Sequence, residues 1–233
     1  MKFSLVIPCF NEAENLPLLL DRCKALILDK EIEVILVDNG STDETQKVMK
    51  SNLSKYPGCR FIHVKENEGY GNGILAGLNS AKGRILGWTH ADMQTDPADA
   101  LVGLDFFDKH GDDIFCKGRR YGRPLLDSIF TLGMSIFESA LLRKNLWDIN
   151  AQPTMFSKEF FNCWDEPPKD FSLDLYAYYL AKKNNLKVFR FPVFFGLRAH
   201  GVSKWNFGFM SRIKFIKRTM SFSLKLIKRI KRK

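Results

Sequence analysis

Short strand-like runs alternate with helix-like patterns along the first hundred residues of this 233-residue chain. The runs have the length and composition of buried strands, and they occupy 3–7, 32–37, 60–64 and 84–88. Between the first two runs, leucines recur at helical spacing from Leu16 to Leu26. A strand, a helix and a second strand in this order form a right-handed crossover in a parallel sheet. The pattern therefore predicts an α/β protein with a mostly parallel sheet flanked by helices.

Polar side chains follow the first two strands directly. Asn11 and Glu12 come after the first strand, and Asp38 and Asn39 end the second. Ligands of parallel sheets bind beyond the carboxyl ends of the strands, so we expect these four residues at one edge of the sheet. Each pair taken singly is typical of an ordinary turn, and the hypothesis of a binding site depends on the whole set.

The segment after the fourth strand contains candidate metal ligands. Asp92 and Gln94 offer carboxylate and amide oxygens, which a hard divalent cation prefers, and Pro97 can open the next helix. Such a cation can neutralise a diphosphate leaving group. An acidic loop is more often a solvated turn, so the metal hypothesis depends on the other segments as well.

A glycine-rich segment follows the third strand, where Gly69, Gly71 and Gly73 lead into a helix pattern. These glycines fall as G-x-G-x-G, whereas the dinucleotide fingerprint is G-x-G-x-x-G after the first strand. The difference argues against a nicotinamide cofactor. The glycines would either let the backbone pass close to a nucleotide or simply form a turn.

In their order and spacing, four segments of the first hundred residues resemble family 2 glycosyltransferases of the GT-A fold, whose sheet is Rossmann-like. These segments are 4–12, 37–43, 69–73 and 91–97. The second half more loosely resembles the polyprenyl-phosphate branch of that family, which includes dolichol-phosphate mannose synthase. The resemblance there is carried by 117–121, 191–193, Arg198 and 201–204, and overall it covers roughly residues 3 to 205.

This resemblance implies an inverting transfer of a sugar from a nucleotide-diphosphate sugar, with Mg²⁺ or Mn²⁺ as the cofactor. It assigns Asp92 and Gln94 to the metal. His90 stands where the family has the first acid of its Asp-x-Asp motif. It would be either a third ligand, better suited to Mn²⁺ than to Mg²⁺, or a hydrogen-bonded neighbour of the site. The implied nucleotide-binding residues are Pro8, Phe10, Asn11, Glu12, Asp38, Asn39, Gly69, Asn72 and Ala91.

The resemblance also implies which residues face the acceptor of the sugar. The family has an aspartate that faces the acceptor, and Asp174 matches it, so Asp174 joins Asp92 as a catalytic candidate. The alternative for Asp174 is a solvated carboxylate in the first turn of a helix. Guanidinium groups bind phosphate through two hydrogen bonds, although they also form ordinary ion pairs. The candidates for holding an acceptor phosphate are Arg120, Arg198, Ser203 and Lys204.

The net charge of +10 is concentrated at the C-terminus, because 212–233 contains ten Lys or Arg residues and no acid. Apolar residues recur there at helical spacing, and a basic amphipathic helix suits an anionic membrane surface. The alternative is a helix that packs on the domain and leaves a solvated basic face. The rest of the chain is close to neutral, so nucleic-acid binding is not expected. We therefore predict a GT-A domain over 1–207 and a basic amphipathic helix over 208–233.

Five scattered cysteines without paired spacing predict reduced thiols. The apolar run before Pro8 is too short for a signal peptide, and no stretch is expected to reach the roughly 18 apolar residues of a membrane span. The sequence thus predicts a cytoplasmic enzyme, peripheral to the cytoplasmic face of the membrane. It would move a sugar to a polyprenyl phosphate or to a lipid-linked surface glycan. The alternative is a nucleotide-sugar-binding protein without transfer activity.

Overall fold

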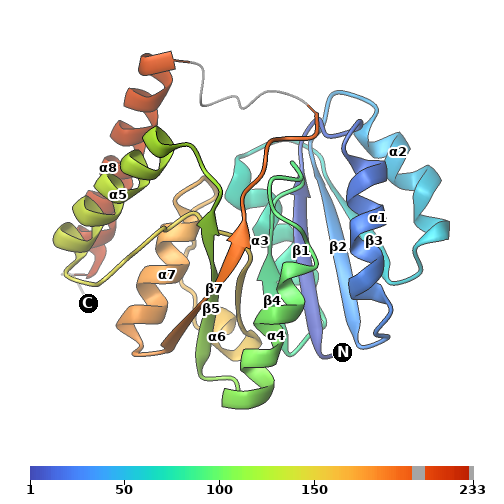
Figure 1. The fold of residues 1–233 in the computed structure, drawn as a ribbon, viewed down its shortest axis with the longest axis horizontal. Helices are drawn as coiled ribbons and strands as arrows, with labels where there is room; N and C mark the ends of the chain where they lie inside the picture. The colour runs from blue at the N-terminus through green and yellow to red at the C-terminus, as the bar shows by residue number, and fades with distance from the viewer. Residues whose placement is uncertain (201–207, 231–233) are drawn as a thin grey trace.

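The protein is built around one seven-stranded sheet, seen in the computed structural model, which describes residues 1–200 and 208–230 (Figure 1). The strand order is β3-β2-β1-β4-β6-β5-β7. Strand β6 runs antiparallel to both of its neighbours, and the other pairs are parallel. This confirms the predicted α/β fold. The strands are β1 (Phe3–Cys9), β2 (Ile32–Asn39), β3 (Cys59–Val64), β4 (Ile85–Trp88), β5 (Ile114–Tyr121), β6 (Thr154–Ser157) and β7 (Lys187–Phe194).

Helices cover both faces of the sheet, because successive side chains of a strand point to opposite faces. On β2, Val34 and Leu36 join the apolar cluster that contains α1, α2 and α4, whereas Ile35 and Val37 join the cluster that contains α3, α6 and α7. The helices are α1 (Leu16–Ile27), α2 (Thr45–Asn52), α3 (Tyr70–Ser80), α4 (Asp99–His110), α5 (Leu125–Leu142), α6 (Lys158–Asn162), α7 (Leu173–Lys183) and α8 (Gly208–Ile230), with a 3-10 turn η1 (Leu53–Lys55).

The central strands end at one edge of the sheet. In the β1–β2 register Cys9 lies opposite Asp38, and β4 ends at Trp88 opposite Val6. The polar residues that follow these strands therefore leave the sheet at the same edge, which is where ligands of parallel sheets bind. The predicted meeting of these residues at the carboxyl edge is confirmed.

The basic C-terminal segment forms the helix that its periodicity predicts, and α8 lies along α5, far from α1 and α2 (Figure 1). The Ser223 hydroxyl donates a hydrogen bond to the Glu138 carboxylate over 2.7 Å, and Leu226 is buried. Lysines 217, 225 and 228 are exposed. Helix α8 thus matches the alternative in which the helix packs on the domain and leaves a solvated basic face, and contact with a membrane stays a prediction.

Helix α5 departs from the expectation that no stretch is apolar enough to cross a membrane. By length and composition its 18 residues pass that test, although the helix lies beside α8 in this structure. The stretch passes with Asp127 and Glu138 included, and Glu138 is buried against α8. One face of α5 carries exposed apolar side chains at helical spacing, namely Leu125, Leu126, Ile129, Leu132 and Ile136.

The buried Glu138 makes the stability of the α5–α8 contact depend on pH. Burial raises the pKa of its carboxyl from 4.5 to about 7. A carboxyl whose folded-state pKa is raised contributes stability that is complete below its unfolded pKa and is lost as pH rises through the folded one. We therefore expect the neutral Glu138→Gln protein to melt about 2–6 °C above wild type at pH 8 and close to wild type at pH 5. Thermal unfolding followed by circular dichroism measures both.

A control for this prediction is Glu159→Gln on α6, because Glu159 is exposed. That variant should show the wild-type dependence on pH. The same melting difference between Glu138→Gln and wild type at both pH values would show that ionisation of Glu138 does not act on the helix pair.

Candidate functional site

The side of the site expected to bind the nucleobase centres on Asp38, which is fully buried near the end of β2. One carboxylate oxygen accepts the Ser41 N–H at 3.0 Å, and the other lies 2.8 Å from Nδ1 of His63. His63 is opposite Asp38 in the β2–β3 register, so strand pairing creates this contact. Sequence analysis missed His63, since no local motif marks it. Both oxygens of this buried carboxylate are thus engaged within the protein, and each has a lone pair left to accept a further hydrogen bond.

The loop after β1 is tied to the loop after β2 by hydrogen bonds that alternate between side chain and backbone. The Asn11 N–H donates to Ser41 Oγ at 3.1 Å, and Asn11 Oδ1 accepts the Thr42 N–H at 2.8 Å. The Glu12 N–H donates to Thr45 Oγ1 at 2.8 Å, and burial raises the pKa of the Glu12 carboxyl. The two loops form one connected rim, which places Asn11 and Glu12 beside Asp38.

Other predicted nucleotide-binding residues lie at the same edge. Pro8 and Asn39 belong to the ends of β1 and β2, while Phe10 directly follows β1 and Ala91 follows β4. The Asn39 amide donates to the Gly69 carbonyl at 2.9 Å, which links the end of β2 to the glycine loop. Asn39 Oδ1 is buried without a partner among the described residues, so it can accept a hydrogen bond from a ligand.

The glycine loop owes its composition to a contact within the protein. A Cβ at Gly69 would clash with the Lys169 carbonyl oxygen, and one at Gly71 would lie 2.7 Å from the Asp170 carbonyl oxygen. The Asn72 N–H donates to the same Lys169 carbonyl at 2.9 Å. The glycines therefore allow close packing against the segment before α7.

The predicted metal ligands Asp92 and Gln94 lie together against the segment that follows β7. The Asp92 carboxylate forms an ion pair with Arg198 at 2.8 Å and accepts the Gln94 N–H at 3.2 Å. The Gln94 side-chain amide donates to the Gly196 carbonyl at 3.1 Å. Arg198, which the resemblance assigned to an acceptor phosphate, thus contacts the carboxylate assigned to the metal.

A divalent cation fits at Asp92 if a diphosphate shares it. Within residues 1–200 and 208–230, no three His, Cys, Asp or Glu side chains cluster so as to hold a metal ion. In nucleotide sites, however, Mg²⁺ is held by one or two carboxylates together with phosphate oxygens. The Asp92 carboxylate and the Gln94 amide meet this smaller requirement.

His90 belongs to an aromatic stack between two acidic residues. Its ring centre lies 5.5 Å from that of Tyr70, which in turn stacks on Phe171 at 4.6 Å. His90 Nδ1 is 3.5 Å from the Tyr70 hydroxyl. Burial lowers the pKa of His90, although Asp92 and Asp174 act in the opposite direction. A neutral imidazole here is a polar neighbour of the site and retains an unprotonated nitrogen for a cation.

Asp174, in the first turn of α7, is buried and linked to two other polar side chains. Gln152 donates to its carboxylate at 2.7 Å, and Lys117 Nζ lies 3.8 Å away. Burial raises the pKa of Asp174 while Lys117 opposes the shift, and burial lowers the pKa of Lys117 to about 7. The alternative of a solvated Asp174 was therefore wrong. Sequence analysis missed the roles of Lys117 and Gln152, and the signal available was a lysine directly after the apolar run that opens β5.

Arg120 is anchored by Asp148, which sequence analysis also missed. Its Nε donates to the Asp148 carboxylate at 2.9 Å, and its backbone N–H donates to the same group at 3.2 Å. Burial acts to raise the pKa of Asp148, but Arg120 outweighs it and the pKa is lowered. Arg120 thus has the ion pair that was its alternative role. Ser203 and Lys204 lie outside the described residues.

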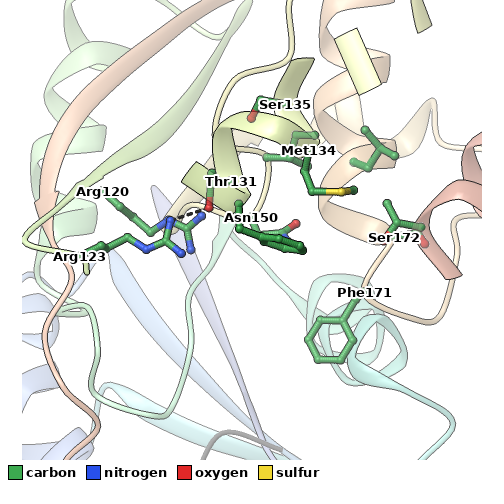
Figure 2. A pocket seen from close by; sticks show the side chains of 12 residues that line it. Arg120, Arg123, Thr131, Met134, Ser135, Asn150, Phe171 and Ser172 are labelled. Atoms are coloured by element: carbon green, nitrogen blue, oxygen red, sulfur yellow. Dashed lines mark hydrogen bonds between the residues drawn. The ribbon is translucent and has the colours of Figure 1, made fainter. Parts of the chain in front are cut away.

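Arg120 also lines a pocket between α5 and the start of α7, with about 600 Å³ of space that is partly open to solvent (Figure 2). Arg123 lies beside it and donates to Thr131 at 2.7 Å (Figure 2). Burial and the neighbouring Arg120 lower the pKa of Arg123, and its Nε is buried without a partner among the described residues. The pocket therefore has two guanidinium groups in its lining, of which that of Arg120 is paired with Asp148. Its apolar lining includes Phe130, Met134, Ile149, Phe171 and Leu175.

Comparison with known sequences agrees with these features. The family model described as Glycosyl transferase family 2 matches residues 4–164. An undecaprenyl-phosphate 4-deoxy-4-formamido-L-arabinose transferase from Photorhabdus laumondii subsp. laumondii is 38% identical over 147 residues, which is 61% of this chain and 44% of that protein. The transferase of the same name from Enterobacter sp. (strain 638) is 39% identical over 100 residues, 41% of this chain and 30% of that protein. The chain spans less than half the length of these curated relatives.

Solved structures share the fold at low sequence identity. Glucosyl-3-phosphoglycerate synthase from Mycobacterium tuberculosis, in complex with Mn²⁺, UDP-Glc and phosphoglyceric acid, has a TM-score of 0.68 and 20% identity, covering 95% of this chain and 79% of that one. A mannosyltransferase from Pyrobaculum calidifontis, in complex with GDP-Man and Mn²⁺, has a TM-score of 0.65 and 17% identity, covering 86% of this chain and 58% of that one. These likenesses confirm a GT-A-like architecture.

Proposed function

The chain belongs to glycosyl transferase family 2, and we propose that it moves a sugar from a nucleotide-sugar to a polyprenyl phosphate at the cytoplasmic face of an anionic membrane. The observation that carries this proposal is the pocket of Arg120 and Arg123, which combines two guanidinium groups with apolar walls. It lies beside Asp174, because Ser172 and Leu175 on either side of that residue line the pocket. A phosphate attached to a prenyl chain matches both parts of this lining.

On the donor side, residues of the chain bind and orient the nucleotide-sugar. Asp38 accepts hydrogen bonds from the nucleobase, and Asp92 with Gln94 would hold a divalent cation. When bound, such a cation offsets the charge of the leaving nucleoside diphosphate. The presence of Mn²⁺ beside nucleotide-sugars in structures of similar fold supports this assignment.

On the acceptor side, the phosphate needs positive charge more than it needs a base. A phosphate monoester has its second pKa near 6, so it is mostly a dianion at neutral pH and already a nucleophile. The two arginines would hold and orient it. Asp174 is buried and accepts a hydrogen bond from Gln152. Both features suit a residue that holds neighbouring side chains of the acceptor site in place. The names of the undecaprenyl-phosphate relatives support the same class of acceptor.

Helices α5 and α8 provide the surface for the membrane. The exposed apolar face of α5 includes Leu126 and Ile129, whereas Phe130 and Met134 of the same helix line the pocket. Helix α8 lies alongside α5 (Figure 1). Its lysines 217, 225 and 228 are exposed. Apolar and basic side chains side by side suit an anionic lipid surface. A lipid acceptor would then reach the pocket along α5.

The test of the function is the formation of a lipid-linked sugar. The protein is incubated with Mn²⁺, radiolabelled nucleotide-sugars and vesicles that contain undecaprenyl phosphate, and label is measured in the lipid extract. We expect one donor to label the lipid. Turnover with a soluble oligosaccharide but none with the prenyl phosphate would overturn the acceptor assignment. Nucleotide-sugar binding without any turnover would instead support a binding protein.

The membrane surface can be tested by charge reversal. Changing Lys217, Lys225 and Lys228 to glutamate should release the protein from vesicles rich in anionic lipid, because each lysine near such a surface adds about 1 kcal/mol. Vesicle co-sedimentation measures the loss, which we expect to exceed 100-fold in the partition coefficient, since reversal replaces attraction by repulsion.

The matched control places the same three substitutions at exposed Lys47, Lys50 and Lys55, on and just after α2 at the other side of the molecule (Figure 1). The net charge changes by the same amount in both variants. Equal release of both from the vesicles would remove the assignment of α8 to the membrane.

A further inference from the structure

The predicted metal ligands Asp92 and Gln94 are both contacted by one segment of the chain, the strap, which consists of residues 195–200 and follows β7. Arg198 in the strap forms an ion pair with Asp92 at 2.8 Å. Gln94 and Gly196 share two hydrogen bonds. The Gln94 side-chain amide donates to the Gly196 backbone carbonyl at 3.1 Å, and the Gly196 N–H donates to the Gln94 backbone carbonyl at 2.8 Å. The strap is therefore fastened at the position where a cation would bind.

The strap also reaches the nucleotide rim. The Asn15 amide lies within hydrogen-bonding distance of the His200 carbonyl, at 3.4 Å, and it donates to the Glu12 carboxylate at 2.5 Å. The same short segment thus contacts the metal position and the loop that carries Glu12.

The ion pair at Asp92 competes with a bound cation. The Asp92 and Arg198 side chains are only 10% and 23% exposed, so little water screens their charges. A divalent cation on the same carboxylate would lie against the guanidinium, and like charges at that distance repel. Arg198 Nε is buried without a partner among the described residues, so the guanidinium is only partly satisfied where it lies.

We infer that the Arg198 guanidinium occupies the cation position at Asp92 until a divalent cation displaces it. Displacement breaks the ion pair and releases the strap from this position. This inference rests on the donor site of the proposed function and deepens it. The cation must first compete with Arg198, so affinity for the metal alone is weakened. Once displaced, Arg198 remains tethered near the site, where its charge can bind a diphosphate.

Competition predicts an unusual result for a residue of the site, because removing it should strengthen metal binding. In the absence of nucleotide, Arg198→Ala should bind Mn²⁺ about five- to tenfold more tightly than wild type, as expected for loss of a partly exposed ion pair. Arg198→Lys keeps the charge and should stay close to wild type. Titration of free Mn²⁺ by its paramagnetic resonance signal measures these affinities.

Arg22→Ala is the matched control for the loss of a positive charge, because Arg22 pairs at 2.8 Å with Asp96 in the same loop as Asp92. That variant should leave the affinity for Mn²⁺ unchanged. An equal gain in Arg22→Ala and Arg198→Ala would show a general charge effect, and no gain in Arg198→Ala would show that Arg198 does not compete. Either result overturns the inference.

Release of the strap has its own readout. Leu197 is 90% exposed, so a nitroxide on Leu197→Cys, in a Cys163→Ser background, reports the mobility of the strap. Diamagnetic Mg²⁺, at a concentration shown to saturate by competition with Mn²⁺, should raise that mobility. Asp92→Asn should show the raised mobility without any cation. A label that stays equally immobile with and without saturating Mg²⁺ overturns the inference.

Neither readout depends on sugar transfer. A protein that passes both tests and transfers no sugar would overturn the proposed function and leave the role of Arg198 intact. A protein that transfers sugar and fails both tests would overturn the role of Arg198 and leave the proposed function intact.

Discussion

Asp92→Asn is expected to lower sugar transfer by roughly 10²–10³-fold, because the amide leaves a divalent cation without its charged protein ligand. The carboxylate is buried and lies at the carboxyl edge of the sheet with Gln94 beside it. Asparagine has nearly the same shape and can still accept the Gln94 N–H, so the fold should be kept. Initial rates with Mn²⁺ and the donor, compared with wild type, measure the loss.

Two variants delimit this prediction. Asp96→Asn removes a carboxylate from the same loop, but Asp96 pairs with Arg22 and accepts the Ala98 N–H at the start of α4, so transfer should stay close to wild type. Asp38→Ala should weaken nucleotide binding with or without metal, whereas Asp92→Asn should weaken only the metal-dependent part. Calorimetry that finds both site variants binding nucleoside diphosphate like wild type would show that the site is misplaced.

Arg123→Ala is expected to lower kcat/KM for the prenyl phosphate by about 30- to 100-fold, the equivalent of roughly 2–3 kcal/mol for a lost charge contact. Arg123 donates a side-chain hydrogen bond to Thr131, and we expect its removal to disturb the fold little. Metal-dependent hydrolysis of the donor should be unaffected, because the pocket lies on the acceptor side. Arg123→Lys keeps the positive charge but lacks the planar guanidinium, so its kcat/KM should lie between those of wild type and Arg123→Ala.

Arg119→Ala is the control, because Arg119 is the exposed neighbour of Arg120 on β5 and is not part of the pocket lining. Asp174→Asn then separates the two classes of acceptor. With a phosphate acceptor it should lose less than Arg123→Ala. With a hydroxyl acceptor it should lose about 10²–10⁴-fold, as expected for removal of a general base. Thermal unfolding of Asp174→Asn must accompany the rates, because Lys117 lies 3.8 Å from the carboxylate.

The sequence by itself determined the architecture and the edge of the sheet that holds the site. Strand and helix periods are local properties, and the right-handed crossover orders consecutive strands, so apolar runs that end in Asp38 and Asn39 predict polar groups at a carboxyl edge. The same local periodicity predicted α8. The resemblance to family 2 glycosyltransferases rested on four such segments, and the family match over residues 4–164 confirms it.

Only the tertiary structure decided which side chains meet at that edge. His63 reaches Asp38 through strand register, Arg198 reaches Asp92 from about a hundred residues further along the chain, and the glycine loop packs on the segment before α7. Burial of Asp174 beside Lys117 likewise depends on α7 covering β5 and β6. The physical reason is that periodicity records which face of an element is apolar. It contains no information on which polar groups from distant strands are brought into contact, and those contacts set the charges of this site.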